Sequence, residues 1–104
     1  MKYYTKQHEH YCGIDLHTKK MYVCILNQQG ETVFHNNINT DPDTFVRIIQ
    51  PFKRDVVVGV ECMFTWYWLS DLCEQEGIDF VFFSPTTKMF YGIDRLATVF
   101  DNIK

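Results

Sequence analysis

The sequence has no apolar run long enough to cross a membrane. Hydrophobic residues make up 46% of the 104 residues, but no uninterrupted run approaches the roughly 20 residues that span a bilayer. The first ten residues are polar and lack the apolar stretch of a secretory signal peptide. Repeats and low-complexity segments are also missing. We therefore expect one globular, cytoplasmic domain with no membrane partner.

An excess of basic charge is missing as well. Ten Lys and Arg residues stand against 13 Asp and Glu residues, which gives a formal net charge of −3. A domain that binds nucleic acid by charge alone is usually basic. Contact with nucleic acid would have to depend on local patches, on metal ions or on another part of the protein. The basic pairs at 19–20 and 53–54 are typical of solvated turns.

The four cysteines lack the paired spacing of a zinc site. Cys12, Cys24, Cys62 and Cys73 are scattered, with no Cys-x-x-Cys among them. Disulfides are rare in the cytoplasm. We expect free, buried thiols that behave as small apolar residues.

Alternating and continuous apolar runs predict five strands and three helices. Three strands at 11–15, 21–26 and 32–36 form an antiparallel meander, with Gly30 at a hairpin turn. Two further strands are expected at 55–60 and 78–83, and the continuously apolar 55–60 is typical of a central strand covered on both faces.

The helix signals lie between these strands. Asp41 is a good N-cap, Pro42 suits the first helical position, and Pro51 places the end of this helix near residue 50. A second helix over about 63–76 would stop at Gly77. Ser84 and Pro85 would open a third. The first helix shows an apolar stripe with helical spacing, formed by Phe45, Ile48, Ile49 and Phe52.

Two acids close two of the predicted strands. Asp15 is the last residue of the first predicted strand, and Glu61 follows the strand at 55–60. A buried charge is costly unless it is neutralised, and ligands bind at the carboxyl ends of strands in open α/β sheets. If the strands are neighbours, the two acids form a divalent-metal site. The alternatives are an Asx-turn at Asp15 and a helix-dipole partner at Glu61.

The element order β-β-β-α-β-α-β-α, with acids after the first and fourth strands, resembles the ribonuclease H-like (RuvC-like) α/β fold with its mixed five-stranded sheet. The resemblance implies that the first and fourth strands are parallel neighbours at the sheet centre.

The sequence further resembles the N-terminal RuvC-like domain of the DEDD transposases, a bacterial insertion-sequence family guided by a bridge RNA. Residues 13–17 (Gly-Ile-Asp-Leu-His) and 21–26 resemble the start of these proteins, and 58–69 with 71–78 resemble their second acidic motif and the helix after it. The resemblance implies DNA strand cleavage and exchange, DNA and guide RNA as partners, and a homo-oligomeric full-length protein.

The family's third motif, Lys-x-Asp-x-x-Asp, is only partly matched. Asp101 stands at one acidic position and Lys104 at the other, with Asp94 a weaker candidate. We favour the interpretation that Asp101 is a solvated terminal residue. Lys104 would place a positive charge at a position where the family has a metal-binding acid. The family's serine-bearing second domain is not found in the sequence. We therefore expect the chain to be inactive in recombination on its own.

The resemblance implies a catalytic, metal-binding set of Asp15, Glu61 and Asp101 with Mg²⁺ or Mn²⁺. In such a site, two cations about 3.5–4 Å apart lie between carboxylates. Asp15 would bridge both ions, Glu61 would hold one, and Asp101 would complete the set. We expect a polar tail over 1–10 and one domain over 11–104, irregular or truncated after about residue 92.

Other chemistries have weaker signals. A transition-metal site could be suggested by His8, His10 and His17 with Glu9 nearby, but we expect His8 and His10 to form an incidental cluster in a tail without fixed geometry. His17 is expected to be a loop histidine, although it could touch a phosphate or the scissile water. Trp66 and Tyr67 are the aromatic residues expected to be exposed, for packing or for stacking on a base. A non-catalytic domain that binds nucleic acid or self-associates is the main alternative. An actin-like ATPase would need a glycine-rich loop after Asp15, which is missing.

Overall fold

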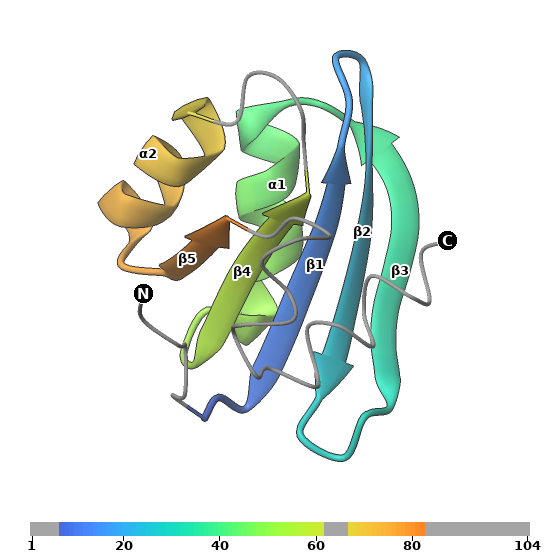
Figure 1. Ribbon diagram of the computed structural model, residues 1–104, viewed down its shortest axis with the longest axis vertical. Helices are drawn as coiled ribbons and strands as arrows, with labels where there is room; N and C mark the ends of the chain where they lie inside the picture. The colour runs from blue at the N-terminus through green and yellow to red at the C-terminus, as the bar shows by residue number, and fades with distance from the viewer. Residues whose placement is uncertain (1–6, 62–66, 83–104) are drawn as a thin grey trace.

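The computed structural model of the chain describes residues 7–61 and 67–82, which form a five-stranded sheet with two α-helices (Figure 1). The elements in chain order are β1 (His10–Leu16), β2 (Lys20–Asn27), β3 (Thr32–Asn39), α1 (Pro42–Ile49), the 3₁₀-helix η1 (Gln50–Phe52), β4 (Val56–Glu61), α2 (Tyr67–Glu76) and β5 (Asp79–Phe82). The predicted third helix, which would begin at Ser84, lies outside the described residues.

The strand order in the sheet is β3-β2-β1-β4-β5. Strands β1 and β2 pair antiparallel, as do β2 and β3, so the predicted meander is confirmed. Strand β4 lies parallel to β1 on its other side, and β5 lies parallel to β4. The first and fourth strands are therefore parallel neighbours in a mixed sheet, as the resemblance implied.

The predicted turn and cap residues act as expected. The Asp41 carboxylate accepts hydrogen bonds from the Thr44 backbone N–H (3.1 Å) and hydroxyl (2.8 Å), which caps α1. Gly30 and Gly77 have positive φ angles of 84° and 71°, in the hairpin after β2 and at the end of α2. Glycine adopts these angles without the steric cost that a side chain would add.

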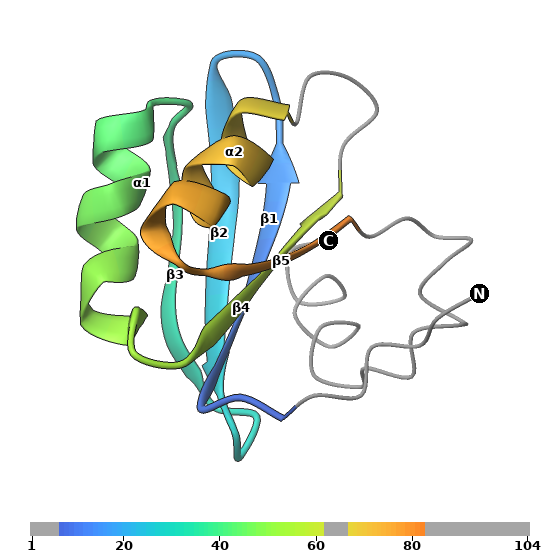
Figure 2. The same ribbon diagram turned by 90° about the vertical axis from the view of Figure 1, so that its left-hand side faces the viewer.

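Both α-helices cover the same face of the sheet (Figure 2). Helix α1 buries Phe45 and Ile49 there, with Ile48 and Phe52 packed at the edge, which confirms the predicted stripe. Helix α2 buries Leu69 and Cys73. Because strand side chains alternate between faces, every second strand residue joins this core. The strand residues in it are Cys12, Ile14, Leu16, Met21, Val23, Ile25, Ile38, Val56, Val58 and Val60, and Ile78, which immediately precedes β5, joins them.

The opposite face of the sheet is apolar over its centre. Tyr11, Leu26, Val57 and Val81 alternate with the core residues and are buried. All five residues at 56–60 are buried, so the prediction that this strand is covered on both faces is confirmed. Within the described residues, no helix is long and apolar enough to span a bilayer.

The ends of β1, β2, β4 and β5 differ by one residue from the sequence-based expectation, and the end of β3 differs by three. Strand β3 continues to Asn39 instead of ending near 36, because its polar residues complete the ladder with β2 while Ile38 reaches the core. Helix α2 is described from Tyr67, and the expected earlier start near 63 lies outside the described residues.

The expectation that His8 lacks fixed geometry is wrong. His8 is only 1% exposed, and its Nδ1 lies 2.8 Å from Asp55 Oδ1 and its Nε2 lies 3.7 Å from Asp79 Oδ2. The Glu9 N–H donates to the other Asp55 oxygen at 3.1 Å. Asp55 immediately precedes β4 and Asp79 opens β5. The segment before β1 is thus attached to the amino ends of β4 and β5. The domain division at residue 10 itself stays a prediction.

We predict that His8→Ala lowers the free energy of unfolding by about 1–3 kcal/mol, because it removes the contacts of a buried imidazole with the carboxylates of Asp55 and Asp79. Urea denaturation of the full chain measures the change. His17→Ala is the matched control, since the His17 side chain is 69% exposed. Equal stability of the His8 and His17 variants would contradict the structural role assigned to His8.

Candidate functional site

The two predicted acids occupy neighbouring positions in the sheet. Asp15 and Glu61 are Cα partners in the parallel pairing of β1 with β4, and each lies at or next to the carboxyl end of its strand. Residues directly opposite one another in neighbouring strands belong to the same face, with strands about 4.8 Å apart. The backbone register therefore brings the two acidic positions together on the face opposite the helices.

Asp15 lies where the buried part of β1 gives way to solvent. Its neighbours Ile14 and Leu16 point into the helix-covered core and are buried, whereas the Asp15 side chain is 36% exposed. A carboxylate in this position keeps part of its hydration and can still accept a cation.

His17 contacts the carboxylate of Asp15. Its Nε2 lies 3.2 Å from Asp15 Oδ1, close enough for an ion pair when the imidazole is protonated. From the sequence, His17 is expected in a loop, with a phosphate, the scissile water or no catalytic group as its contact. The structure shows that its contact is with the acid, so His17 can help to orient that carboxylate.

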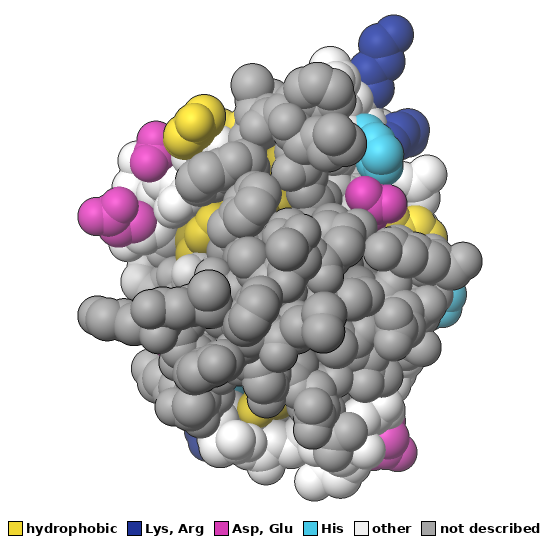
Figure 3. Space-filling view, viewed as in Figure 1, with side chains coloured by type: hydrophobic (Ala, Val, Ile, Leu, Met, Phe, Trp, Pro, Cys, Tyr) yellow, Lys and Arg dark blue, Asp and Glu magenta, His cyan; other side chains and the backbone are white. Residues whose placement is uncertain are grey.

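The turn that carries His17 is held in place by its neighbours. The His17 N–H donates to the Lys20 carbonyl at 3.1 Å, and the Thr40 hydroxyl donates to the His17 carbonyl at 2.8 Å. The Thr40 N–H donates to the Lys19 carbonyl at 2.9 Å. Lys19 and Lys20 are both exposed. Figure 3 shows basic side chains, a histidine and an acidic side chain gathered at one end of the molecule, the end where β1 turns into β2 in Figure 1.

Two carboxylates at the paired positions of Asp15 and Glu61 would be a suitable but small donor set for a hard cation. Carboxylate oxygens suit Mg²⁺, which is commonly held by one or two carboxylates together with waters and substrate phosphates. Among the side chains that the structure describes, no group of three or more from His, Cys, Asp or Glu could hold a metal. The third expected acid, Asp101, lies outside the described residues, as do Asp94 and Lys104.

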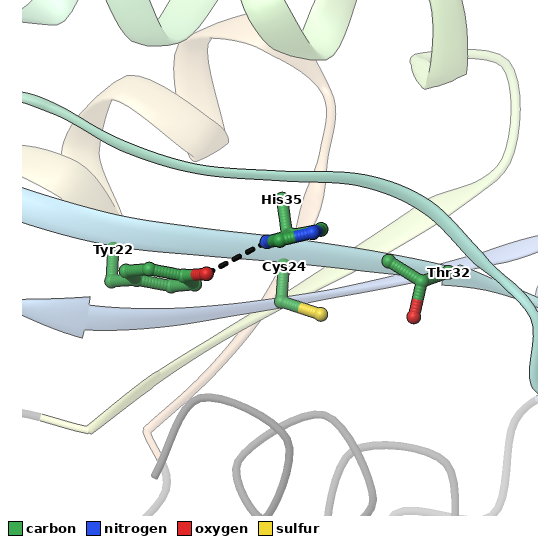
Figure 4. Close-up of a pocket in the computed structure, with 4 residues that line it drawn as sticks. All are labelled: Tyr22, Cys24, Thr32 and His35. Atoms are coloured by element: carbon green, nitrogen blue, oxygen red, sulfur yellow. Dashed lines mark hydrogen bonds between the residues drawn. The ribbon is translucent and has the colours of Figure 1, made fainter.

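Sequence reasoning missed a pocket on the neighbouring strands. Tyr22, Cys24, Thr32 and His35 line a cavity of about 350 Å³ on β2 and β3 (Figure 4). Tyr22 is the Cα partner of Asp15, so this pocket lies on the same face as the acids. The spacing of two residues between Tyr22 and Cys24 already indicated that their side chains lie on the same face of a strand. That His35 of β3 joins them follows only from the pairing register of β2 with β3.

The described cysteines are free and buried, as predicted. Cys12, Cys24 and Cys73 form no disulfide among themselves, and Cys62 lies outside the described residues. Burial disfavours the charged thiolate and raises the pKa of Cys12 well above its usual value. Burial, together with the nearby Glu76 carboxylate, raises the pKa of Cys73 to about 12.

The predicted exposure of aromatic residues holds where it can be tested. Tyr67 is 65% exposed at the start of α2, and Trp68 packs against the core as a partly buried residue. Trp66 and Phe64 lie outside the described residues.

Comparison with known proteins gives a likeness of fold. No known protein family matches the sequence, and no curated protein matches it. Among solved structures, the chain is similar to T. thermophilus RuvC in complex with a Holliday junction substrate, with a TM-score of 0.61 and 14% sequence identity. The match covers 92% of this chain and 78% of the RuvC chain. The chain therefore has a RuvC-like α/β fold of the ribonuclease H-like class.

We predict that Cys12 and Cys73 resist alkylation by iodoacetamide at pH 8 in the folded chain, because burial keeps both thiols protonated and inaccessible. Mass spectrometry of the digested protein measures the modification at each site. Addition of urea should make both react. An unfolded cysteine thiol loses its proton near pH 9, whereas folded Cys73 loses it only near pH 12, because burial raises its pKa. The free energy of unfolding should therefore fall as the pH rises from 9 to 12. Rapid labelling of Cys73 at pH 8 without denaturant would contradict the buried position.

Proposed function

We propose that the chain is a RuvC-like domain that acts on DNA through divalent-metal-dependent phosphodiester cleavage, with Asp15 and Glu61 as its metal ligands. The observation that carries this proposal is the in-register pairing of the two acids at the carboxyl ends of the parallel strands β1 and β4. The likeness to a RuvC structure that contains a Holliday junction substrate supports a nucleic-acid substrate.

Asp15, with a partly exposed side chain on the central strand, and Glu61 on β4 would hold the divalent cations. Such cations would supply positive charge to neutralise the scissile phosphate and to activate the attacking oxygen. Asp101 is proposed as the third ligand.

The chain's own residues would position the substrate around these acids. His17 contacts one oxygen of Asp15 and leaves the other available to a cation. Lys19 and Lys20, exposed on the same turn, can contact the phosphates next to the scissile one. The net charge of −3 does not prevent DNA binding on this proposal. The phosphates need positive charge only at the surface that they contact, and this turn supplies it locally.

Within the RuvC-like class, we propose the more specific role of the N-terminal domain of a DEDD transposase. The support is the resemblance of residues 13–26 and 58–78 to the acidic motifs of that family. On this proposal the guide RNA, the homo-oligomeric state and recombination activity belong to the full-length transposase.

We predict that Mg²⁺ raises the affinity of the chain for a four-way DNA junction. Asp15→Asn and Glu61→Gln should each lower the affinity in Mg²⁺ about tenfold or more, since either variant loses a metal ligand. Fluorescence anisotropy with a labelled junction, in Mg²⁺, Ca²⁺ and EDTA, measures the affinities. Asp71→Asn, which changes an exposed acid on α2, is the matched control. Junction binding that ignores both metal and the acid substitutions would contradict the proposal and favour a non-catalytic binding domain.

A further inference from the structure

Tyr22 and His35 form a hydrogen-bonded pair of rings that lie side by side, with nearly parallel planes, on the surface of the sheet. Their ring centroids lie 6.1 Å apart with an angle of 26° between the planes. A hydrogen bond of 2.7 Å joins the Tyr22 hydroxyl to His35 Nδ1. Each ring thus restricts the motion of the other. Since Tyr22 is partly exposed and His35 is exposed, the pair is accessible from solvent.

The remaining pocket residues give the site a floor and a rim. Cys24 is only 2% exposed and lies next to His35, with Tyr22 on one side and the exposed Thr32 on the other (Figure 4). The cavity of about 350 Å³ falls in the range of about 300–1,000 Å³ that is usual for small-molecule pockets. An aromatic pair, a soft apolar floor and a hydroxyl at the rim suit a flat heterocycle with polar edges.

The pocket lies one strand away from the acids. The register runs across the sheet from Glu61 to Asp15, from Asp15 to Tyr22 and from Tyr22 to Asn37. Antiparallel Cα partners are about 4.5–5.5 Å apart. A nucleotide whose phosphate lay at Asp15 would therefore have its base, or that of its neighbour, within reach of Tyr22.

We propose that the Tyr22–His35 pocket binds an unpaired nucleobase by stacking, next to the backbone held at Asp15 and Glu61. The position of the base relative to a scissile phosphate rests on the proposed function, but the stacking itself does not. A neutral base fits this place better than a second phosphate, because the nearest charged position on the neighbouring strand is the acid Asp15. Stacking on aromatic and imidazole rings tolerates any base sequence.

The first experiment uses nucleosides, which carry no phosphate and need no metal. Adenosine and cytidine are titrated in EDTA into the ¹⁵N-labelled chain, and the chemical shifts are followed by NMR. We expect saturable shifts at residues 22, 24, 32 and 35, lost in Tyr22→Ala and in His35→Ala. Asn36→Ala is the matched control, since Asn36 is exposed on the same strand and alternates to the other face. Unchanged shifts at all four pocket residues would overturn the proposal.

The second experiment compares single-stranded DNA and RNA oligonucleotides by fluorescence anisotropy in EDTA. Loss of one stacked base typically lowers the affinity by a factor of about 5 to 150, which is the loss expected for Tyr22→Ala. Tyr22→Phe keeps the ring and should keep most of the affinity. The tighter of the two oligonucleotides identifies the source of the base. If the wild type and Tyr22→Ala bind the DNA and the RNA oligonucleotide with equal affinity, the proposed base-binding pocket is overturned. Absence of a Mg²⁺ effect on junction binding would overturn only the proposed cleavage site.

Discussion

The parallel, in-register pairing of β1 with β4 is the constraint on which the functional interpretation depends. It sets Asp15 beside Glu61 at the carboxyl end of the sheet. A shift of one residue would move one of the two acids to the helix-covered face, where an unpaired charge would be costly. Ile14 and Val60, buried in the core beneath the helices, fix this register because their side chains fit only one face. The hydrophobic core thus determines where the charges lie.

The amino and carboxyl ends of the parallel strands have different roles. At the amino ends, His8 bridges Asp55 and Asp79 and attaches the preceding segment to β4 and β5. At the carboxyl ends, Asp15 has a partly exposed carboxylate, a histidine partner and a basic turn. Ligands of open α/β sheets bind at the carboxyl ends. The fully buried histidine therefore stabilises the fold, and the exposed one belongs to the candidate site.

Much of the fold could be predicted from the sequence because its signals are local. The apolar runs, the Asp41 cap and the two glycines with positive φ each act within a few residues, and a resemblance of element order supplied the pairing of β1 with β4. The contacts of His8 with Asp55, and of Tyr22 with His35, could not be predicted in this way. They join residues 47 and 13 positions apart through side-chain geometry that no periodicity encodes. Asp101 is assigned only by family resemblance, and it stays a prediction.

The most direct test of the central claim is a Mn²⁺ titration of the ¹⁵N-labelled chain followed by NMR, because this paramagnetic ion broadens the signals of nearby residues. The account predicts saturable broadening centred on residues 15 and 61 and their strand neighbours, lost in the Asp15→Asn, Glu61→Gln double variant. Broadening centred instead on His8, Asp55 and Asp79, or an unchanged response in the double variant, would contradict a metal site at the paired ends of β1 and β4.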